Sequence, residues 1–419
     1  MDCTQKKTHF FEPSAKELSL CNLWQRSPVF KTYKIPLMIQ TLAATFHLTH
    51  QCNLRCTYCY TGTKVHRPMS RAIARKSLQF VLDEARKAQV KYLDITFFGG
   101  EPLIEAELLF WLADSFQEKL PAGMTLSFRL STNGTLLTES MMQALAQRDI
   151  YVSLSVDGVP EIQDAQRPNA AGKGSSAAIE KAIPLLLRSN PCASVTTVLT
   201  PYSAGYAAES IDWLYQKGFR YFNLTLDYSA DWTMEDMHLL EKSYHKLAHW
   251  YEEKMQQNQH FYLSCFDERI RSHSQGPPGQ DERCNLGQRQ FSIAPDGALY
   301  PCIQFVTTET LPEFMIGHVL HGGFDENCRE HLYSCSEKPK DACNGCALQG
   351  RCASWCSCIN FASTGTVTQA SPVVCYHERT LMPLVDAMAN RLWRKRNRLF
   401  LHKHYNPLYP MIDYLEHLV

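Results

Sequence analysis

The sequence predicts an α/β fold: a partial (β/α)6 TIM-like barrel followed by a smaller cysteine-rich domain. Short runs of β-branched and aromatic residues alternate with helical stretches six times, which is typical of a parallel sheet or barrel. The 17 cysteines are unevenly placed, with three between Cys52 and Cys59 and ten between Cys284 and Cys375. A chain of 419 residues also has room for two to three domains at about 150 residues each.

Six segments are predicted to be strands because their apolar residues form short continuous or alternating runs. They are 45–49, 92–98, 125–130, 151–156, 194–199 and 221–226. The clearest helix is predicted over 70–89, with Ser70 as its N-cap and apolar residues at helical spacing. Functional residues of such folds collect in the loops at the carboxyl ends of the strands.

We expect four segments along the chain. They are an N-terminal extension (1–43), the barrel (44–270), the cysteine-rich domain (281–378) and a helical tail (379–419). The boundary follows from the linker-like stretch SHSQGPPGQ at 272–280. The tail has six Lys or Arg and no acid over 391–404, which allows an acidic-peptide or nucleic-acid contact. A solvated helix face packed through Leu392, Trp393, Leu399 and Phe400 is favoured.

Composition excludes several classes of function. Acidic and basic residues balance at 42 each and the isoelectric point is about 7.2, so a nucleic-acid partner is not expected. No apolar run reaches the length of about 18 residues that a membrane span needs. The N-terminus lacks the basic-then-apolar pattern of a secretory signal, which predicts a cytoplasmic protein.

The first cysteine group has the spacing C-x3-C-x2-C, formed by Cys52, Cys56 and Cys59 in a loop after a predicted strand. Three thiolates on one loop can hold three irons of a four-iron cluster and leave the fourth iron open. A tetrahedral zinc site is the alternative, with His50 or His66 as fourth ligand. The spacing alone favours iron and sulfur over zinc.

This loop resembles the signature of the radical S-adenosylmethionine (SAM) superfamily, including the aromatic residue before its last cysteine. Three later segments resemble other motifs of the family in the same order: the GGEP turn at 99–102, the TNGT segment at 132–135 and the S-x-S-x-D-G strand end at 153–158. The resemblance implies SAM contacts from Tyr58, Gly99, Gly100, Glu101, Pro102, Ser131, Asn133, Ser153, Ser155, Asp157 and Arg167. A His-Asp pair of relatives is here Gln163-Asp164, so no role of that histidine is carried over.

The second cysteine group reads C-x12-G-x4-C at Cys284 and Cys302, then C-x2-C-x5-C-x3-C from Cys343 to Cys356, then Cys375. Two zinc ribbons are the alternative for such pairs. The whole string resembles the SPASM domain of radical SAM peptide-modifying enzymes. That resemblance implies an outer cluster on Cys343, Cys346, Cys352 and Cys375, and an inner one on Cys284, Cys302 and Cys356. The fourth inner ligand is open among Cys358, Cys335, Cys328 and no protein ligand.

The resemblance, over roughly residues 44–378, implies a radical SAM oxidoreductase with SAM and three [4Fe–4S] clusters as cofactors. Its expected substrate is a ribosomally made precursor peptide (a RiPP), whose side chains acquire a carbon–carbon or thioether crosslink. An external one-electron reductant of flavodoxin or ferredoxin type is implied. The 43 residues before the first strand are too few for a winged-helix leader-binding module, so a separate leader-binding protein or the SPASM face would recognise any leader.

Two other functions stay open. Anaerobic sulfatase-maturing enzymes share this architecture but place an aspartate directly after the cysteine equivalent to Cys302, where this chain has Ile303-Gln304. A non-catalytic iron–sulfur carrier or zinc scaffold would not require the SAM motifs. Asp94, Asp227 and Asp267 are candidate catalytic bases at the barrel mouth, although for each a solvated or capping role is favoured.

Overall fold

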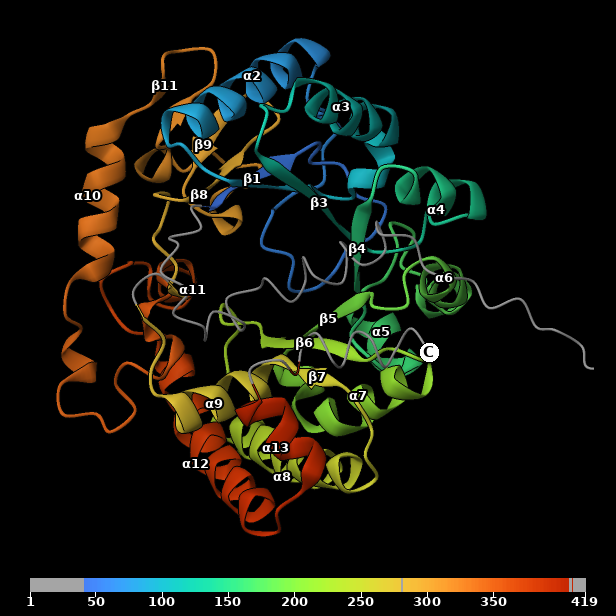
Figure 1. Cartoon of the computed structure of the whole chain (residues 1–419), viewed down its shortest axis with the longest axis vertical. Coiled ribbons are helices and arrows are strands. Elements are labelled where there is room, and N and C mark those ends of the chain that lie inside the picture. The colour runs from blue at the N-terminus through green and yellow to red at the C-terminus, as the bar shows by residue number, and fades with distance from the viewer. Residues whose placement is uncertain (1–40, 280–281, 407–408, 410–419) are drawn as a thin grey trace, which may run out of the picture.

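A single sheet of eleven strands organises the chain in the computed structural model, which describes residues 41–279, 282–406 and 409 (Figure 1). The strand order is β11-β10-β9-β8-β1-β2-β3-β4-β5-β6-β7. Strands β1 to β7 are parallel, and β8 continues the parallel pairing on the other side of β1. Strands β9 to β11 are antiparallel additions. The predicted α/β class is confirmed.

The strands and helices alternate along the barrel. Its strands are β1 (Thr41–His47), β2 (Tyr92–Phe98), β3 (Thr125–Thr132), β4 (Ile150–Ser155), β5 (Ser194–Leu199), β6 (Tyr221–Leu226) and β7 (Tyr262–Leu263). Its helices are α2 (Arg71–Lys87), α3 (Ala106–Lys119), α4 (Glu139–Ala146), α5 (Pro160–Gln166), α6 (Ser176–Ser189), α7 (Ala207–Gln216), α8 (Met234–Gln256) and α9 (Ser264–Gln275).

The C-terminal part has shorter elements joined by longer loops. Its strands are β8 (Gln290–Ile293), β9 (Ala298–Tyr300), β10 (Gly317–His318) and β11 (Gly323–Phe324). Its helices are α10 (Glu326–Glu337), α11 (Ser357–Thr364), α12 (Pro372–Arg394) and α13 (Arg398–Tyr405). Because β8 pairs with β1, the sheet continues from the barrel into this part of the chain.

All six predicted strands are present. The first lies earlier than predicted, at Thr41–His47, because Thr49 has left the sheet and forms an isolated bridge with Pro68. The predicted helix is α2, and the Ser70 side chain accepts the N–H of Ile73 at 3.2 Å, as expected of an N-cap. Local periodicity and capping therefore located these elements to within a few residues.

The two faces of the sheet differ in polarity. Alternate side chains such as Leu42, Ile95 and Leu130 are buried. The helices α2, α3, α4, α6 and α7 lie outside the curved sheet (Figure 1). The intervening positions carry polar residues such as Thr96 and Ser131, which alternation places on the opposite, inner face. The barrel therefore has an apolar outer layer and a polar interior.

The basic tail forms the end of α12 and then α13, which pack beside α8 and α9 (Figure 1). Leu392, Leu399 and Phe400 are buried as predicted, whereas Trp393 is 38% exposed. Arg391 pairs with Glu252 of α8. Across the described part of the chain, no helix is both long and apolar enough to cross a membrane.

A buried ion pair attaches α13 to α9. Asp267 is 3% exposed, and its carboxylate lies 2.8 Å from Lys403 Nζ. It also accepts the Tyr251 hydroxyl at 2.7 Å and the Leu263 N–H at 2.6 Å. Removing one partner of a buried pair leaves the other charge without its counterion, which typically costs more than the pair contributes.

We expect Asp267→Ala to lower the free energy of unfolding by about 3–5 kcal/mol, because the buried Lys403 ammonium loses its carboxylate. The matched control is Asp227→Ala, since within the described residues the Asp227 carboxylate accepts only the N–H and hydroxyl of Ser229 in a turn. Its expected cost is about 1 kcal/mol. Urea unfolding followed by circular dichroism measures both, and equal midpoints for the two variants would contradict the prediction.

Candidate active site

The first cysteine group lies in the loop between β1 and α2, at the carboxyl end of the sheet. Cys52 is buried, whereas Cys56 and Cys59 are partly exposed. The three thiols are close to one another: the charge of Cys59 raises the pKa of both Cys52 and Cys56, and the charge of Cys52 raises that of Cys56. Burial raises the pKa of Cys56 to about 11, an effect that the Arg167 charge opposes. The structure therefore brings the three predicted ligands together.

Lys64 is a neighbour of this group that the sequence did not single out. Its ammonium donates to Cys59 Sγ at 2.9 Å and also contacts the Thr61 hydroxyl. Burial alone would raise the pKa of Cys59, but hydrogen bonds from Lys64 and Thr61 bring it below its usual value. Lys64 thus favours the thiolate form, which is the form that binds metal.

The glycine turn after β2 fixes the backbone that leads into the cysteine loop. Gly100 N–H donates to Thr49 O, and Glu101 N–H donates to Gln51 O, both at 2.8 Å. A Cβ atom on Gly100 would lie 2.2 Å from Gln51 O, far inside van der Waals contact. Only glycine permits this approach.

Glu101 ties the turn to the end of β3. Its carboxylate is 1% exposed and accepts the backbone N–H of Asn133 and the Thr132 hydroxyl, each at 2.8 Å. It also accepts the N–H of Leu103. Burial raises the pKa of Glu101, while these hydrogen bonds oppose the rise. Its carboxylate thus positions the loops around the site.

Asn133 links the end of β3 to the cysteine loop. Its amide nitrogen donates to Asn53 Oδ1 at 2.8 Å and lies 3.8 Å from Cys52 Sγ. On the same inner face, Ser153 accepts a hydrogen bond from Ser194. Within the described residues, the hydroxyls of Ser131 and Ser155 have no hydrogen-bonding partner, so they are available to a ligand.

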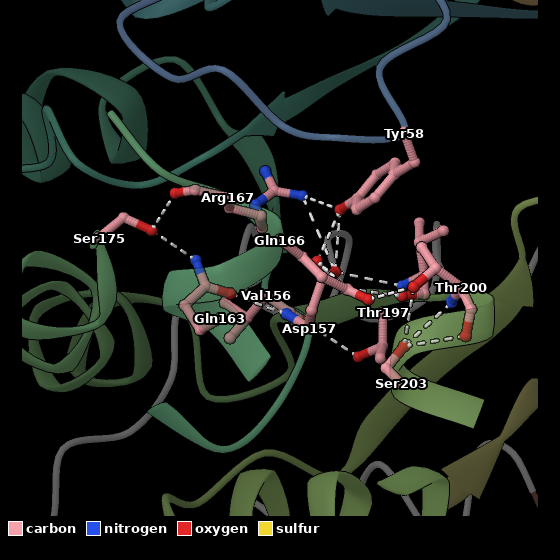
Figure 2. Close-up of polar contacts among 11 residues, drawn as sticks. Tyr58, Val156, Asp157, Gln163, Gln166, Arg167, Ser175, Thr197, Thr200 and Ser203 are labelled. Atoms are coloured by element: carbon pink, nitrogen blue, oxygen red, sulfur yellow. Dashed lines mark hydrogen bonds and ion pairs between the residues drawn. The ribbon is translucent and has the colours of Figure 1, made fainter. Parts of the chain in front are cut away.

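A buried cluster joins the cysteine loop to the end of β4 (Figure 2). The Tyr58 hydroxyl lies 2.9 Å from both oxygens of Asp157 and receives a hydrogen bond from Arg167 at 2.5 Å. Arg167 Nη1 is 3.9 Å from Asp157. Burial raises the pKa of Asp157, and the Arg167 charge opposes this. Tyr58, Asp157 and Arg167, which were each predicted to contact SAM, therefore also contact one another.

Gln163 and Gln166 complete this cluster from α5. Gln163 Oε1 accepts the Asp157 N–H at 2.9 Å, and Gln166 donates to the Asp157 carboxylate at 2.8 Å (Figure 2). Gln163 also donates to the Ser175 hydroxyl at 2.9 Å, so its structural role here is to hold the loop after β4.

The three candidate bases lie in different surroundings. Asp94 pairs with Arg129 at 3.0 Å, four residues before the end of β2 and so about 13 Å from its carboxyl end. Asp227 directly follows β6 but caps a turn through Ser229. Asp267 belongs to the buried pair with Lys403. The structure brings none of them into contact with the cysteine loop.

The four predicted outer ligands come together. The charges of Cys343, Cys352 and Cys346 all affect the Cys375 thiol, whose pKa is raised, chiefly by burial. Ser354 Oγ lies 3.2 Å from Cys352 Sγ and 3.7 Å from Cys343 Sγ. Cys375 of α12 thus completes the outer group, whose other three thiols lie in the segment from Cys343 to Cys352.

The three predicted inner ligands also form one group. Burial raises the pKa of Cys284 to about 12, and the charges of Cys356 and Cys302 add to this effect. These cysteines come from the loop before β8, the end of β9 and the start of α11. Folding therefore collects thiols that are up to 72 residues apart, from Cys284 to Cys356.

The surroundings fit thiolate-bound clusters better than single ions. Among the described residues, no three His, Cys, Asp or Glu side chains converge closely enough to hold one metal ion. His66, a candidate zinc ligand, instead lies 2.6 Å from Gln51 Oε1. A four-iron cluster binds each thiolate to a different iron, so its ligands need not meet at one point.

Two hydroxyls close to the inner thiols support this fit. Tyr60 Oη and Ser357 Oγ are buried without a hydrogen-bonding partner among the described residues. The pKa of Tyr60 is raised, chiefly by burial and further by the nearby charges of Cys302, Cys59 and Cys358. Buried donors are nearly always satisfied, and the sulfurs of a cluster would accept such hydrogen bonds.

Comparison with known families agrees with this geometry. Residues 46–214 match the family model of the radical SAM superfamily. This segment is a radical SAM domain. It includes the cysteine loop, the glycine turn, Asn133 and the Tyr58–Asp157–Arg167 cluster. Enzymes of this superfamily use SAM together with an iron–sulfur cluster.

Several curated relatives are similar over most of the chain. A cysteine-type anaerobic sulfatase-maturating enzyme of Clostridium perfringens is 25% identical over 331 residues, covering 73% of this chain and 85% of the relative. Mycofactocin maturase MftC of Mycolicibacterium smegmatis is 26% identical over 336 residues, covering 76% and 79%. An uncharacterized protein of Methanocaldococcus jannaschii is 28% identical over 179 residues, but the chain spans only 60% of its length and 43% of this chain is covered.

Solved structures share the fold of the radical SAM domain and of the part that follows it. Native anSMEcpe with bound AdoMet and Cp18Cys peptide superposes with a TM-score of 0.72 at 21% identity, covering 86% of this chain and 99% of that one. Streptococcus suis SuiB bound to precursor peptide SuiA gives 0.57 at 16% identity, covering 89% and 84%.

We expect Gly100→Ala to weaken cluster binding in the radical SAM domain, because its Cβ would displace the backbone at Gln51 and move Cys52. Overpacking of this kind costs about 1–3 kcal/mol, enough for roughly a ten-fold loss of SAM affinity. The control is Gly205→Ala, since nothing lies within 4 Å of its Cβ position. Iron analysis and equilibrium binding of SAM after anaerobic reconstitution measure the effect. Wild-type iron content and affinity in Gly100→Ala would contradict it.

Proposed function

We propose that this radical SAM protein is a peptide maturase that oxidatively crosslinks side chains of a ribosomally made precursor, forming a carbon–carbon or thioether bond. The observation that carries the proposal is the joint presence of the three-thiol loop at the barrel mouth and two further thiol groups after the barrel. Relatives named as maturases, including MftC, agree with a peptide or protein substrate.

In this proposal Cys52, Cys56 and Cys59 hold a four-iron cluster, and SAM occupies the polar mouth beside it. Ser131 and Ser155 supply hydroxyls that no described residue uses, and Asn133 stands next to Cys52. When bound and reduced, the cluster and SAM supply a 5'-deoxyadenosyl radical that removes a hydrogen atom from the substrate. The network of Tyr58, Asp157 and Arg167 holds the mouth in shape before SAM arrives.

The electron balance of crosslinking gives the inner and outer thiol groups a role. Crosslinking removes two hydrogens: one leaves as an atom on 5'-deoxyadenosine, and the other as a proton with one electron. The electron that starts each cycle comes from an external flavodoxin or ferredoxin type of reductant. We propose that clusters on the inner and outer cysteines, in a SPASM-like domain over 281–378, accept the electron that leaves the substrate.

Sulfatase maturation is a second candidate, favoured by the likeness to anaerobic sulfatase-maturating enzymes over most of the chain. Against it, Ile303 follows Cys302 where that reaction is expected to use an aspartate. The next residue, Gln304, is exposed and is not an acid. Neither the isoleucine nor the glutamine side chain is a base that could accept the proton released by oxidation of the substrate.

We expect the anaerobically reconstituted protein to convert SAM to methionine and 5'-deoxyadenosine when a strong reductant is added. Cys56→Ala should lose at least about a hundred-fold of this rate, because one iron loses its thiolate. The control is Cys328→Ala, because the Cys328 thiol contacts Met315 O and is not one of the assigned ligands. Chromatography measures the rate at which 5'-deoxyadenosine forms. Equal rates for Cys56→Ala and wild type would exclude a cluster bound by Cys56.

We expect Cys346→Ala to cleave SAM but to release at least about ten-fold less crosslinked peptide than the wild type. The reason is that an electron acceptor is lost while the first cluster site is intact. Mass spectrometry of a co-expressed small peptide measures the product, and a loss of two hydrogens per site marks a crosslink. Normal crosslinking by Cys346→Ala would limit the outer cluster to a structural role. With the wild-type protein, a peptide of unchanged mass, or formylglycine in a sulfatase substrate, would contradict the preferred reaction.

A further inference from the structure

The inner group of thiols contains a fourth member. Cys356 Sγ and Cys358 Sγ lie 3.4 Å apart, and Cys358 is also within hydrogen-bonding reach of Cys302. Cys356 in turn lies near Cys284, as does Cys302. Cys358 is 8% exposed, so this contact occurs inside the protein. The thiols of Cys284, Cys302, Cys356 and Cys358 therefore form one group of neighbours.

The two other cysteines that the sequence left open lie elsewhere. Cys328 and Cys335 both belong to α10. Cys328 Sγ donates to Met315 O at 3.5 Å, and Cys335 Sγ lies 3.7 Å from His331 Nε2 on its own helix. Neither is among the groups that shift the pKa of Cys284 or Cys358. Of the candidates, Cys358 alone shares the surroundings of the inner group.

The local backbone suits two ligands that are one residue apart. Cys356 is the N-cap of α11, and Cys358 lies in the first turn of that helix. Thiolates are stabilised at the positive end of a helix. Rotation about the Cα–Cβ bonds can direct the two sulfurs to different irons, while Ser357 between them keeps a buried hydroxyl that has no partner among the described residues.

We infer that Cys358 is the fourth protein ligand of the inner cluster, so that Cys284, Cys302, Cys356 and Cys358 bind all four of its irons. The inference rests on the proposed function, because it takes an inner four-iron cluster as given. Its consequence is chemical. A cluster with four protein thiolates has no open iron, so it serves as an electron acceptor and does not bind a thiolate of the substrate.

Tyr60 gives this inner cluster a connection to the first one. Its buried hydroxyl has no partner in the described chain, and the charges of Cys59, Cys302 and Cys358 all affect its pKa. The loops behind it are joined as well, since Thr308 N–H donates to Thr61 O at 3.1 Å. Tyr60 and this backbone contact therefore connect the inner thiols to the first thiol group, as suits an electron acceptor.

The test uses the full chain with Cys52, Cys56 and Cys59 all changed to alanine, so that only the C-terminal cysteines can bind clusters. Mild oxidation with ferricyanide releases an iron that lacks a protein thiolate and leaves a three-iron cluster with a distinct EPR signal. We expect no such signal in this background. Adding Cys358→Ala should produce on the order of one three-iron cluster per chain, because one iron becomes open.

Cys328→Ala and Cys335→Ala in the same background are the matched controls and should give no signal. A three-iron signal before Cys358 is changed, or its absence in a folded Cys358→Ala chain, would overturn the assignment. Circular dichroism establishes folding, and Cys358→Ser, which is closer in size to cysteine, provides a second variant with an altered Mössbauer spectrum if Cys358 is a ligand. Failure of the triple-alanine chain to bind any iron would instead refute the proposed auxiliary clusters.

Discussion

The close backbone contact between the glycine turn and the segment before Cys52 is the constraint on which the site depends. Gly100 can approach Gln51 because it has no Cβ, and this brings the end of β2 against the start of the cysteine loop. Glu101 then reaches the end of β3, and Asn133 reaches back to Asn53. Three consecutive strand ends are thus locked around one thiol loop by contacts that any larger residue at position 100 would break.

The polar groups at this mouth are mostly satisfied by one another. Glu101 and Asp157 are buried carboxylates, and each is surrounded by donors from the protein. Leaving such charges without partners would cost several kcal/mol, so their geometry is strongly determined. The mouth is therefore organised in advance, which reduces the ordering that a bound ligand must otherwise cause.

Local patterns predicted the parts of the fold that depend on neighbours in sequence. Strand alternation, the Ser70 cap and the division of cysteines into groups all follow from spacing within a few residues. Contacts between residues far apart in the sequence could not be predicted from such local patterns. Lys64 beside Cys59 has no periodic signal, and Asp267 could not be recognised as the partner of Lys403, 136 residues later. The choice of Cys358 over Cys335 likewise needed the position of α11 relative to Cys302.

The barrel and the C-terminal part achieve their stability differently. The barrel has a continuous apolar layer between its strands and helices, whereas residues 282–378 contain short elements around thiols that are mostly only partly buried. Burial raises the pKa of thiols such as Cys284 and Cys375, which opposes the ionised form that metal binding requires. Bound metal ions compensate the charge of four neighbouring thiolates, so metal binding and folding are coupled there. Loss of clusters should therefore loosen the loops that carry these thiols, while the apolar core that both parts of the chain share is kept.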